Sequence, residues 1–578
     1  MEKRTLLAVV LSFIVIMVWQ TWVLPPPPVP EESASPGVTP TGVSTAESAA
    51  AGSSGPEATA GSAGTADPSL AGMTEATPEV LETNLPEQET TLARDAFVAV
   101  FTTEGGGIKS WKLNDYTRYR RGEGPLDVVR NLLASKPILE RNETKMDLLG
   151  GPYANAVPFR VRGDGSTERR CELVEHGDAG VTYRCRDGQV RLLKRYTVED
   201  DPYLVHLEVE ATNVGPDPVT LRPWLGVRGW APAEKRGTFA PTSVPAYHAN
   251  GETERVDPED VEGEETVVQG EVDWAGVDDK YFLRAILPPV GEMSRVAVRP
   301  LPASASRPGD IGEEGPVRPF SVAVESSNGR VVQPGETMTV AYDLFLGPKR
   351  SEVLGAYERN LEESLDFGMF GVFAEPILAL LKLLYRWVGS YGVAIILLTV
   401  IIKTLFYPLM VKQMESAAKM KEFQPQMAEL RERYKDDKEK LNQEMMRFMQ
   451  EKKINPLGGC LPLLLQMPIW FALYRVLQNS IELYHTPFLY LPDLSERDPF
   501  GISPLVLGVL MFVQQKMTPP APGMDPVQAK MMQYLPLIFA AIMFTLPSGL
   551  VVYILVNTIL TIIQQAYITK RTAAKAGT

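Results

Sequence analysis

The chain contains little cysteine and histidine, and it lacks an excess of basic residues. Among 578 residues there are three cysteines and four histidines, and the formal net charge is −14. So few cysteines exclude a disulfide-dense scaffold and a multi-cysteine zinc protein, and four histidines leave little material for a histidine-rich metal site. The acidic balance excludes a basic nucleic-acid binder, so we expect no nucleic-acid specificity.

Charge is divided unevenly along the chain, whose length allows two to four domains. Residues 351–578 hold 22 Lys+Arg and 20 Asp+Glu, which leaves 35 and 51 for residues 1–350. The first part therefore carries a net charge of −16 and the second part +2. This difference in net charge indicates that the two parts lie in different surroundings.

Six apolar runs have about the length that a bilayer core requires. The first, residues 6–24, follows Lys3 and Arg4 and ends before four prolines. The other five lie at about 390–410, 457–479, 501–517, 530–546 and 548–568. We interpret 1–24 as an uncleaved transmembrane anchor. The alternative is a cleaved signal peptide, whose apolar core would be shorter and followed by a small-residue cleavage site.

Positive charges between the runs indicate the orientation. Segment 411–455 carries eleven Lys/Arg, and the tail 569–578 carries Lys570, Arg571 and Lys575. Positive-inside reasoning places both segments and the N-terminus in the cytoplasm. The acidic region 25–365 then lies outside.

Composition divides the outer region. Residues 25–90 are rich in Pro, Ala, Ser, Thr, Gly and Glu and predict a disordered linker. Residues 91–350 show short alternating runs separated by turn clusters, such as 96–101 and 203–209, and predict a β-sandwich domain. Gly105, Gly106 and Gly107 predict a turn.

Two cysteines lie at equal distances from a predicted hairpin turn. Cys171 and Cys185 are both seven residues from Asp178, so a hairpin would place them opposite each other. Outside the cytoplasm they can form a disulfide. The alternative is a pair of reduced cysteines in a half-buried hairpin.

Two helical segments flank the second apolar run. Residues 366–388 predict an amphipathic interfacial helix with Pro376 in its first turn, the alternative being a longer, tilted span. Segment 411–455 alternates charge signs at helical spacing and predicts a two-helix cytoplasmic hairpin, with Asp436 and Asp437 at its turn.

One charged residue stands well inside a predicted span. Lys403 lies at a depth where a charge costs at least about 2.5 kcal/mol and usually faces a bundle interior or a wet cavity. Thr399 and Tyr407, one helical turn before and after, should share its face. Other spans contribute further polar side chains, namely Gln466, Gln514, Gln515 and Asn557.

These residues predict a hydrated, positively charged groove that is open to the cytoplasm and the lipid. Such a groove would draw in the short polar tail of a hydrophobic segment that is crossing the bilayer. The alternative for Lys403 is that its side chain snorkels to the interface. For Gln466 and Asn557 the alternative is an interhelical hydrogen bond.

At these residues the chain resembles the YidC, Oxa and Alb family of membrane protein insertases. The motifs that carry the resemblance are IKTLFYPL at 402–409, NPLGGCLP at 455–462, QMP at 466–468, QKM at 515–517, PSGL at 547–550 and IIQQ at 562–565. The start MVWQTW at 17–22 is similar to the anchor of the Gram-negative branch.

The resemblance implies a multi-pass protein of the bacterial inner membrane. It predicts a five-helix insertase core at 389–568 besides the anchor, with six transmembrane helices in all, a periplasmic β-supersandwich and a cytoplasmic helical hairpin. It implies insertion of membrane proteins alone or beside the Sec translocon, and chaperone work there. The implied partners are nascent integral membrane proteins, Sec components, lipids and, as a further candidate, the ribosome. No enzyme activity, cofactor or metal is expected.

The chain departs from the family pattern at two positions. The family's groove charge is usually Arg, and Lys403 keeps the charge but loses the bidentate fork. A family aromatic in the last span falls at Ile554, beside Tyr553. The resemblance implies a client-binding groove of Lys403, Thr399, Gln466, Gln515, Tyr553 and Asn557.

Two other classes of protein compete with this interpretation. A solute transporter would require internal repeats and a midplane site, and 389–568 shows no repeat between its halves. An envelope enzyme would require a catalytic pair in the sandwich, and the scattered His176, His206 and His248 specify none.

Overall fold

The computed structural model describes most of the chain after residue 85. The described ranges are 86–117, 145–149, 157–161, 171–199, 201–232, 243–257, 266–301, 317–411, 423–434, 437–452, 457–517, 534, 536 and 538–576. The predicted anchor 1–24 and nearly all of the predicted linker 25–90 lie outside these residues.

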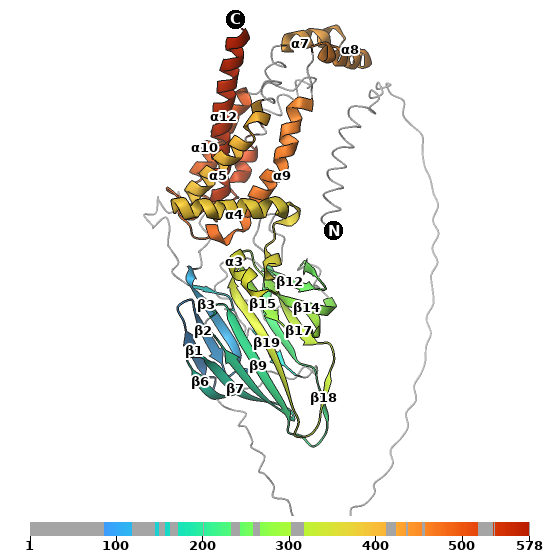
Figure 1. Ribbon diagram of the computed structural model, residues 1–578, viewed down its shortest axis with the longest axis vertical. Coiled ribbons are helices and arrows are strands. Elements are labelled where there is room, and N and C mark those ends of the chain that lie inside the picture. The colour runs from blue at the N-terminus through green and yellow to red at the C-terminus, as the bar shows by residue number, and fades with distance from the viewer. Residues whose placement is uncertain are drawn as a thin grey trace, which may run out of the picture. The chain divides into compact units, whose positions relative to one another are not determined.

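The described residues between 89 and 348 form antiparallel strands and their connections (Figure 1). Within the described residues, a small sheet contains β1 (Glu89–Ala93), β2 (Phe97–Thr102), β3 (Gly107–Thr117) and β4 (Lys145–Asp147). The large sheet runs, in spatial order, through β5 (Phe159–Arg160), β11 (Trp224–Pro232), β17 (Val317–Ser326), β16 (Met293–Pro300), β14 (Thr266–Asp278), β15 (Phe282–Leu287), β19 (Thr337–Pro348), β9 (Leu204–Asn213), β8 (Val190–Thr197), β7 (Gly180–Asp187) and β6 (Glu172–Gly177). β12 (Val244–Ala249) pairs with β14 and with β13 (Glu252–Arg255), and β10 (Val219–Leu221) pairs with β18 (Arg330–Val332).

The two larger sheets enclose a shared hydrophobic core. β8 buries every second residue, as the period of a strand requires. Phe97 and Trp111 of the small sheet lie in one buried cluster with Tyr196 and Leu207 of the large sheet. The alternating runs of the sequence therefore predicted a β-rich region correctly. The order of its strands could not be read from them.

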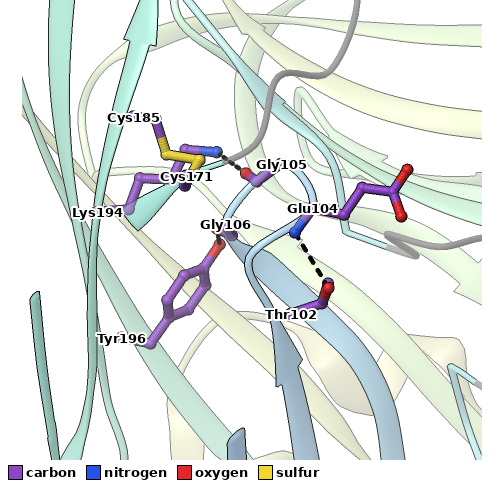
Figure 2. The surroundings of a disulfide bond; sticks show 8 residues. All are labelled: Thr102, Glu104, Gly105, Gly106, Cys171, Cys185, Lys194 and Tyr196. Atoms are coloured by element: carbon purple, nitrogen blue, oxygen red, sulfur yellow. Dashed lines mark hydrogen bonds between the residues drawn. A yellow bond between two sulfur atoms is a disulfide. The ribbon is translucent and has the colours of Figure 1, made fainter. Parts of the chain in front are cut away.

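Cys171 and Cys185 are joined by a disulfide (Figure 2). The β6–β7 hairpin turns between Gly177 and Gly180, half a residue after the expected centre. A bulge between Leu173 and Glu175 shifts the register by one residue and brings the two cysteines into line, with 4.4 Å between their Cα atoms. A regular hairpin from this turn would have paired Cys171 with Arg186, one residue away from Cys185.

The turn between β2 and β3 packs directly against this disulfide. Gly105 and Gly106 have φ angles of 69° and 56°, which favour glycine, so the predicted turn is confirmed. Lys194 Nζ donates to the Gly105 carbonyl (2.6 Å), and the Tyr196 hydroxyl donates to the Gly106 carbonyl (3.0 Å) (Figure 2). A Cβ at Gly106 would lie 2.9 Å from Cys171 Sγ, so the disulfide also requires glycine there.

Replacing Cys171 and Cys185 with serine should lower the free energy of unfolding by about 3 kcal/mol, because the disulfide closes a loop of about 15 residues. The measurement is thermal unfolding of the full chain in detergent, with and without reductant. Reductant should lower the wild-type midpoint to that of the double variant and leave the variant unchanged. An equal effect of reductant on both proteins would contradict the prediction.

A connecting segment, residues 351–367, joins the β domain to the helices. It contains α3 (Ser351–Leu354), η2 (Gly355–Tyr357) and η3 (Leu361–Ser364). Leu354 and Leu361 are buried against Trp274 and Phe345 of the large sheet. Because the Trp274 indole N–H also donates to the Asn360 carbonyl (3.1 Å), the segment is fixed to the sheet by packing and by hydrogen bonds.

The predicted interfacial segment 366–388 forms η4 (Gly368–Phe370) and then α4 (Gly371–Val388). Figure 1 shows α4 lying across the helices α5 and α12. Pro376 lies inside this helix and not in its first turn, because the helix begins five residues before it. The expected position of Pro376 is therefore wrong.

The C-terminal part is helical in the described residues. The helices are α5 (Tyr391–Leu405), α7 (Gln424–Arg433), α8 (Lys438–Glu451), α9 (Leu457–Asn479), α10 (Ile502–Met517) and α12 (Ser548–Ala576), with η5 (Ile481–Leu483) after α9. Residues 538–543 are also helical. Ser548–Ile568 is the one stretch of the described chain that satisfies the length and hydropathy expected of a membrane span, and α5 and α10 are apolar but shorter. The count of six spans therefore stays a prediction.

Helices α7 and α8 follow each other within the predicted hairpin. The Asp437 side chain accepts from the Lys440 backbone N–H (3.0 Å) and so caps α8, as Ser, Thr, Asp and Asn do at helix starts. The Phe423 and Phe448 rings are 6.0 Å apart, which joins the start of α7 to α8.

Candidate functional site

Lys403 lies in a buried position on α5 and reaches across to α12. Lys403 is 5% exposed, and its Nζ donates to Thr561 Oγ1 at 2.7 Å. A weaker contact joins Nζ to Met410 Sδ at 3.8 Å. Neither contact is to a carboxylate, and within the described residues the ammonium, which has three hydrogens to donate, forms no ion pair.

Thr399 lies one turn before Lys403 and is 1% exposed, so it shares the buried face of α5. Its hydroxyl donates to the Ile395 carbonyl at 2.7 Å, which satisfies it within its own helix. Thr399 therefore has no hydroxyl hydrogen left to donate to a bound group without losing this bond.

Tyr407 does not share this face, so that expectation is wrong. α5 ends at Leu405, because Pro408 has no N–H to donate to the Thr404 carbonyl, and residues 407–411 are helical again after a turn at Phe406. The backbone closes a tighter bond from the Leu409 N–H to the Phe406 carbonyl (3.1 Å), and the side chain of Tyr407 is 37% exposed.

One face of α12 carries the partner of Lys403. Tyr553, Asn557 and Thr561 are spaced by four residues and therefore lie along one face. The Thr561 hydroxyl, which accepts from Lys403, donates to the Asn557 carbonyl at 2.7 Å. Tyr553 is buried in the hydrophobic cluster that also contains Leu398. The structure thus joins Lys403 to Thr561, a residue that the sequence interpretation missed, and Asn557 contributes its backbone carbonyl to the Thr561 hydroxyl.

The other two predicted groove residues are less closely placed. Gln515 is half-buried on α10, which packs against α12. Gln466 lies within α9, and the structure does not describe its side chain. Neither residue is shown to contact Lys403.

Replacing Thr561 with valine should leave the Lys403 ammonium without its nearest oxygen, at a cost of about 1–3 kcal/mol. The matched control is Thr558→Val, because the buried Thr558 hydroxyl donates only to the Ile554 carbonyl of its own helix. Thermal unfolding of the full chain in detergent should show a larger loss for Thr561→Val than for Thr558→Val. Equal losses would mean that the bond between α5 and α12 contributes nothing.

The PSGL motif at 547–550 positions the start of α12 against the loop that precedes α10. The Ser548 hydroxyl donates to the Asp493 carbonyl (2.7 Å), and the Gly549 N–H donates to the Leu494 carbonyl (2.8 Å). A Cβ at Gly549 would lie 3.0 Å from the Leu494 oxygen. This motif therefore has a structural role: it fixes the helix that carries Asn557 and Thr561.

Asp493, in the same loop, is 1% exposed. Its Oδ1 accepts from the Ser495 N–H and hydroxyl, both at 2.8 Å, whereas Oδ2 has no hydrogen-bond partner among the described residues. Burial raises the pKa of Asp493 to about 7. The loop that holds α12 therefore contains a carboxyl group that titrates near neutral pH.

The β domain contains histidine–carboxylate pairs that the sequence did not reveal. His248 Nδ1 lies 2.9 Å from Asp273 Oδ2, and its Nε2 lies 3.6 Å from Glu363 Oε2 of the connecting segment. The His248 side chain is only 3% exposed. This pair holds the connecting segment against the sheet and offers little surface to a substrate.

Two family models match the chain, and together they cover the β domain and the helices. The model described as YidC periplasmic domain matches residues 89–380, and the model described as 60Kd inner membrane protein matches residues 383–575.

Relatives match nearly the whole chain. The membrane protein insertase YidC of Pelobacter propionicus is 36% identical over 586 residues, which covers 99% of each chain. That of Geobacter sp. (strain M21) is 35% identical over 486 residues and covers 84% of this chain and 86% of the relative. A crystal structure of an active YidC insertase covers 84% of this chain and 93% of its own, at 17% identity and a TM-score of 0.34.

A β-rich domain followed by apolar helices, matched by these two family models, defines an inner membrane protein with a periplasmic domain. The chain belongs to the YidC family of membrane protein insertases. Insertion, the activity for which the relatives are named, is not an enzymatic reaction.

Proposed function

We propose that this protein inserts nascent integral membrane proteins into the inner membrane and assists their folding there. Family membership over 99% of the chain supports the activity. The observation that carries the mechanism is Lys403, a buried cation with no carboxylate partner in the described part of the chain. Such a residue inside an apolar helix is expensive and usually functional.

The proposed site is a hydrophilic groove, open to the cytoplasm and to lipid, beside Lys403. Thr561 accepts one hydrogen of the ammonium and Met410 offers a weak second contact, so further acceptors are needed. Water or the polar tail of a client supplies them. Thr399, Gln466, Gln515, Tyr553 and Asn557 complete the groove, with Tyr553 as an apolar wall.

The proposed membrane arrangement has six transmembrane helices. An anchor within 1–24 precedes a linker over 25–90 and a periplasmic domain over 91–350. The interfacial helix at 366–388 leads to a five-helix core over 389–568, which includes the cytoplasmic hairpin 411–455. The tail 569–578 and the N-terminus lie in the cytoplasm. The positive charges of 411–455 and of the tail support this orientation.

The free energy for insertion comes from the client. Burial of its apolar segment in lipid releases about 25 cal/mol per Å² of apolar surface. An acidic tail gains about 2.3 kcal/mol per charge for each 100 mV of membrane potential. Lys403 lowers the barrier by attracting the tail to a point partway across the bilayer, which shortens the apolar distance that remains.

The proposed partners are nascent membrane proteins, membrane lipids, components of the Sec translocon and the ribosome. On the proposed cytoplasmic side, where nascent chains arrive, the hairpin 411–455 offers eleven Lys/Arg, against nine Asp/Glu, to a polyanionic ribosome. Beside the Sec translocon, the same groove would accept segments of larger clients.

Reconstitution tests the proposed function. The purified full chain in lipid vesicles should convert a small single-span client to a protease-protected form, well above the level of protein-free vesicles. Equal protection in protein-free vesicles would contradict the proposal. Flux of small solutes through the same vesicles without a client would favour a transporter instead.

A further inference from the structure

A cavity of about 1100 Å³ lies between the connecting segment and α4. Its lining includes five carboxylates and three basic side chains, together with apolar residues such as Leu378 and Leu383. Lys382 of α4 is bound on one side by Glu352 (3.0 Å) and on another by Glu482 (2.8 Å), which fixes the helix above the segment.

Helix α4 presents three different faces. Ala374, Leu378, Leu381 and Leu384 are buried against the other helices. Glu375, Lys382 and Arg386 follow one another at spacings of seven and four residues, so they form a charged strip, and all three line the cavity. A third, apolar strip is exposed and includes Val372 at 80% and Trp387 at 78%.

The exposed apolar strip adjoins the cavity. Leu383 is 44% exposed and also lines the cavity, so an apolar surface leads directly to the charged strip. An amphipathic helix with such a strip lies in a membrane interface, where acyl chains meet their headgroups. The cavity is then at the depth of lipid headgroups.

Three charged residues of the cavity, two acidic and one basic, have no side-chain partner among the described residues. Glu362, Glu375 and Arg386 form no side-chain hydrogen bond or ion pair with the described residues, and all three are exposed. Two free carboxylates suit a primary ammonium, which donates three hydrogen bonds, and a free guanidinium suits a phosphate oxygen pair. The cavity therefore complements a zwitterion that carries both groups.

We propose that this cavity binds the headgroup of an aminophospholipid such as phosphatidylethanolamine. Arg386 binds the phosphate, Glu362 and Glu375 bind the ammonium, and the acyl chains lie along the apolar strip of α4. The bound lipid joins α4 to the connecting segment and so ties the β domain to the membrane surface. This inference depends on the interfacial position of α4 and not on the insertion activity.

Native mass spectrometry of the full chain in detergent tests the proposal. Phosphatidylethanolamine, phosphatidylcholine and phosphatidylglycerol with identical acyl chains are offered singly. We expect the amine lipid to be retained on the order of tenfold better than the choline lipid, whose methylated ammonium donates no hydrogen bond. Equal retention of these two lipids would overturn the proposal.

Variants identify the site. The double variant Glu362→Gln, Glu375→Gln should abolish the preference for the amine lipid. Arg386→Gln should weaken the binding of both zwitterionic lipids, phosphatidylethanolamine and phosphatidylcholine. The matched control is Glu429→Gln with Arg433→Gln, an exposed ion pair on α7. A preference that survives the double variant, or that the control also removes, would contradict the assignment.

A competition experiment distinguishes a site for a lipid from a site for a soluble ligand. Glycerophosphoethanolamine carries the same headgroup without acyl chains and should not displace the lipid at equal concentration. Displacement by this compound would show a site for soluble phosphoamines and would overturn the lipid assignment. Because every arm measures binding, failure of these tests leaves the insertion assay unaffected.

Discussion

Lys403→Glu should reduce insertion of a small client with an acidic tail by at least about tenfold, equivalent to about 1.4 kcal/mol. The variant replaces an attractive charge with a repulsive one at a position that is 5% exposed, where dissolved salt screens little. Lys403→Met should also reduce insertion, because it keeps the shape of the side chain and removes its charge. The measurement is protease protection in reconstituted vesicles.

Lys403→Arg should retain most of the activity, since the positive charge is preserved. A matched control is Lys516→Glu, which reverses the charge of an exposed lysine at the end of α10. Full insertion by both Lys403→Glu and Lys403→Met, at normal protein level, would remove the groove charge from the mechanism.

Asp493→Asn should change how stability depends on pH. The pKa of Asp493 is raised to about 7 by burial, against an ordinary value of 3.8. Between these values the folded protein binds a proton that the unfolded chain has released, so the free energy of unfolding falls as pH rises, by up to about 1.4 kcal/mol per pH unit. The whole effect is about 4 kcal/mol, and it is complete above pH 7.

The variant lacks this proton, so its stability relative to the wild type should increase from pH 4 to pH 7 and then stay level. Thermal midpoints of the full chain in detergent at several pH values measure the difference. Glu429→Gln, which removes a carboxylate that is 72% exposed, is the control. A difference between Asp493→Asn and wild type that is constant from pH 4 to pH 8 would contradict the prediction.

The sequence identified the residues whose burial costs free energy, but it did not identify the residues that form hydrogen bonds with them. Lys403 could be found because a charge in an apolar run is rare. Thr561 could not, because a threonine satisfies its hydroxyl within its own helix and is common in membrane spans. Only the packing of α5 against α12 shows that this hydroxyl accepts from Lys403.

Local backbone chemistry explains the corrections. Helical periodicity placed Tyr407 beside Lys403, but α5 ends between them, at Leu405, because Pro408 cannot donate to the Thr404 carbonyl. The cysteine pairing was expected from symmetry about Asp178, yet it depends on a bulge at Leu173 that no residue pattern indicates. The order of the strands in the large sheet rests on contacts between distant segments, which alternation alone does not specify.

Site-specific photocrosslinking from α5, α10 and α12 tests most directly whether a client occupies a groove at Lys403. Crosslinkers at Gln515 and Asn557, which leave the Lys403 ammonium in place, should form adducts with a nascent membrane protein. Crosslinkers at Ile401 and Val509, which are exposed apolar positions on α5 and α10, should form far fewer. Adducts at Ile401 and Val509 but none at the two polar positions would contradict a client-binding groove at Lys403.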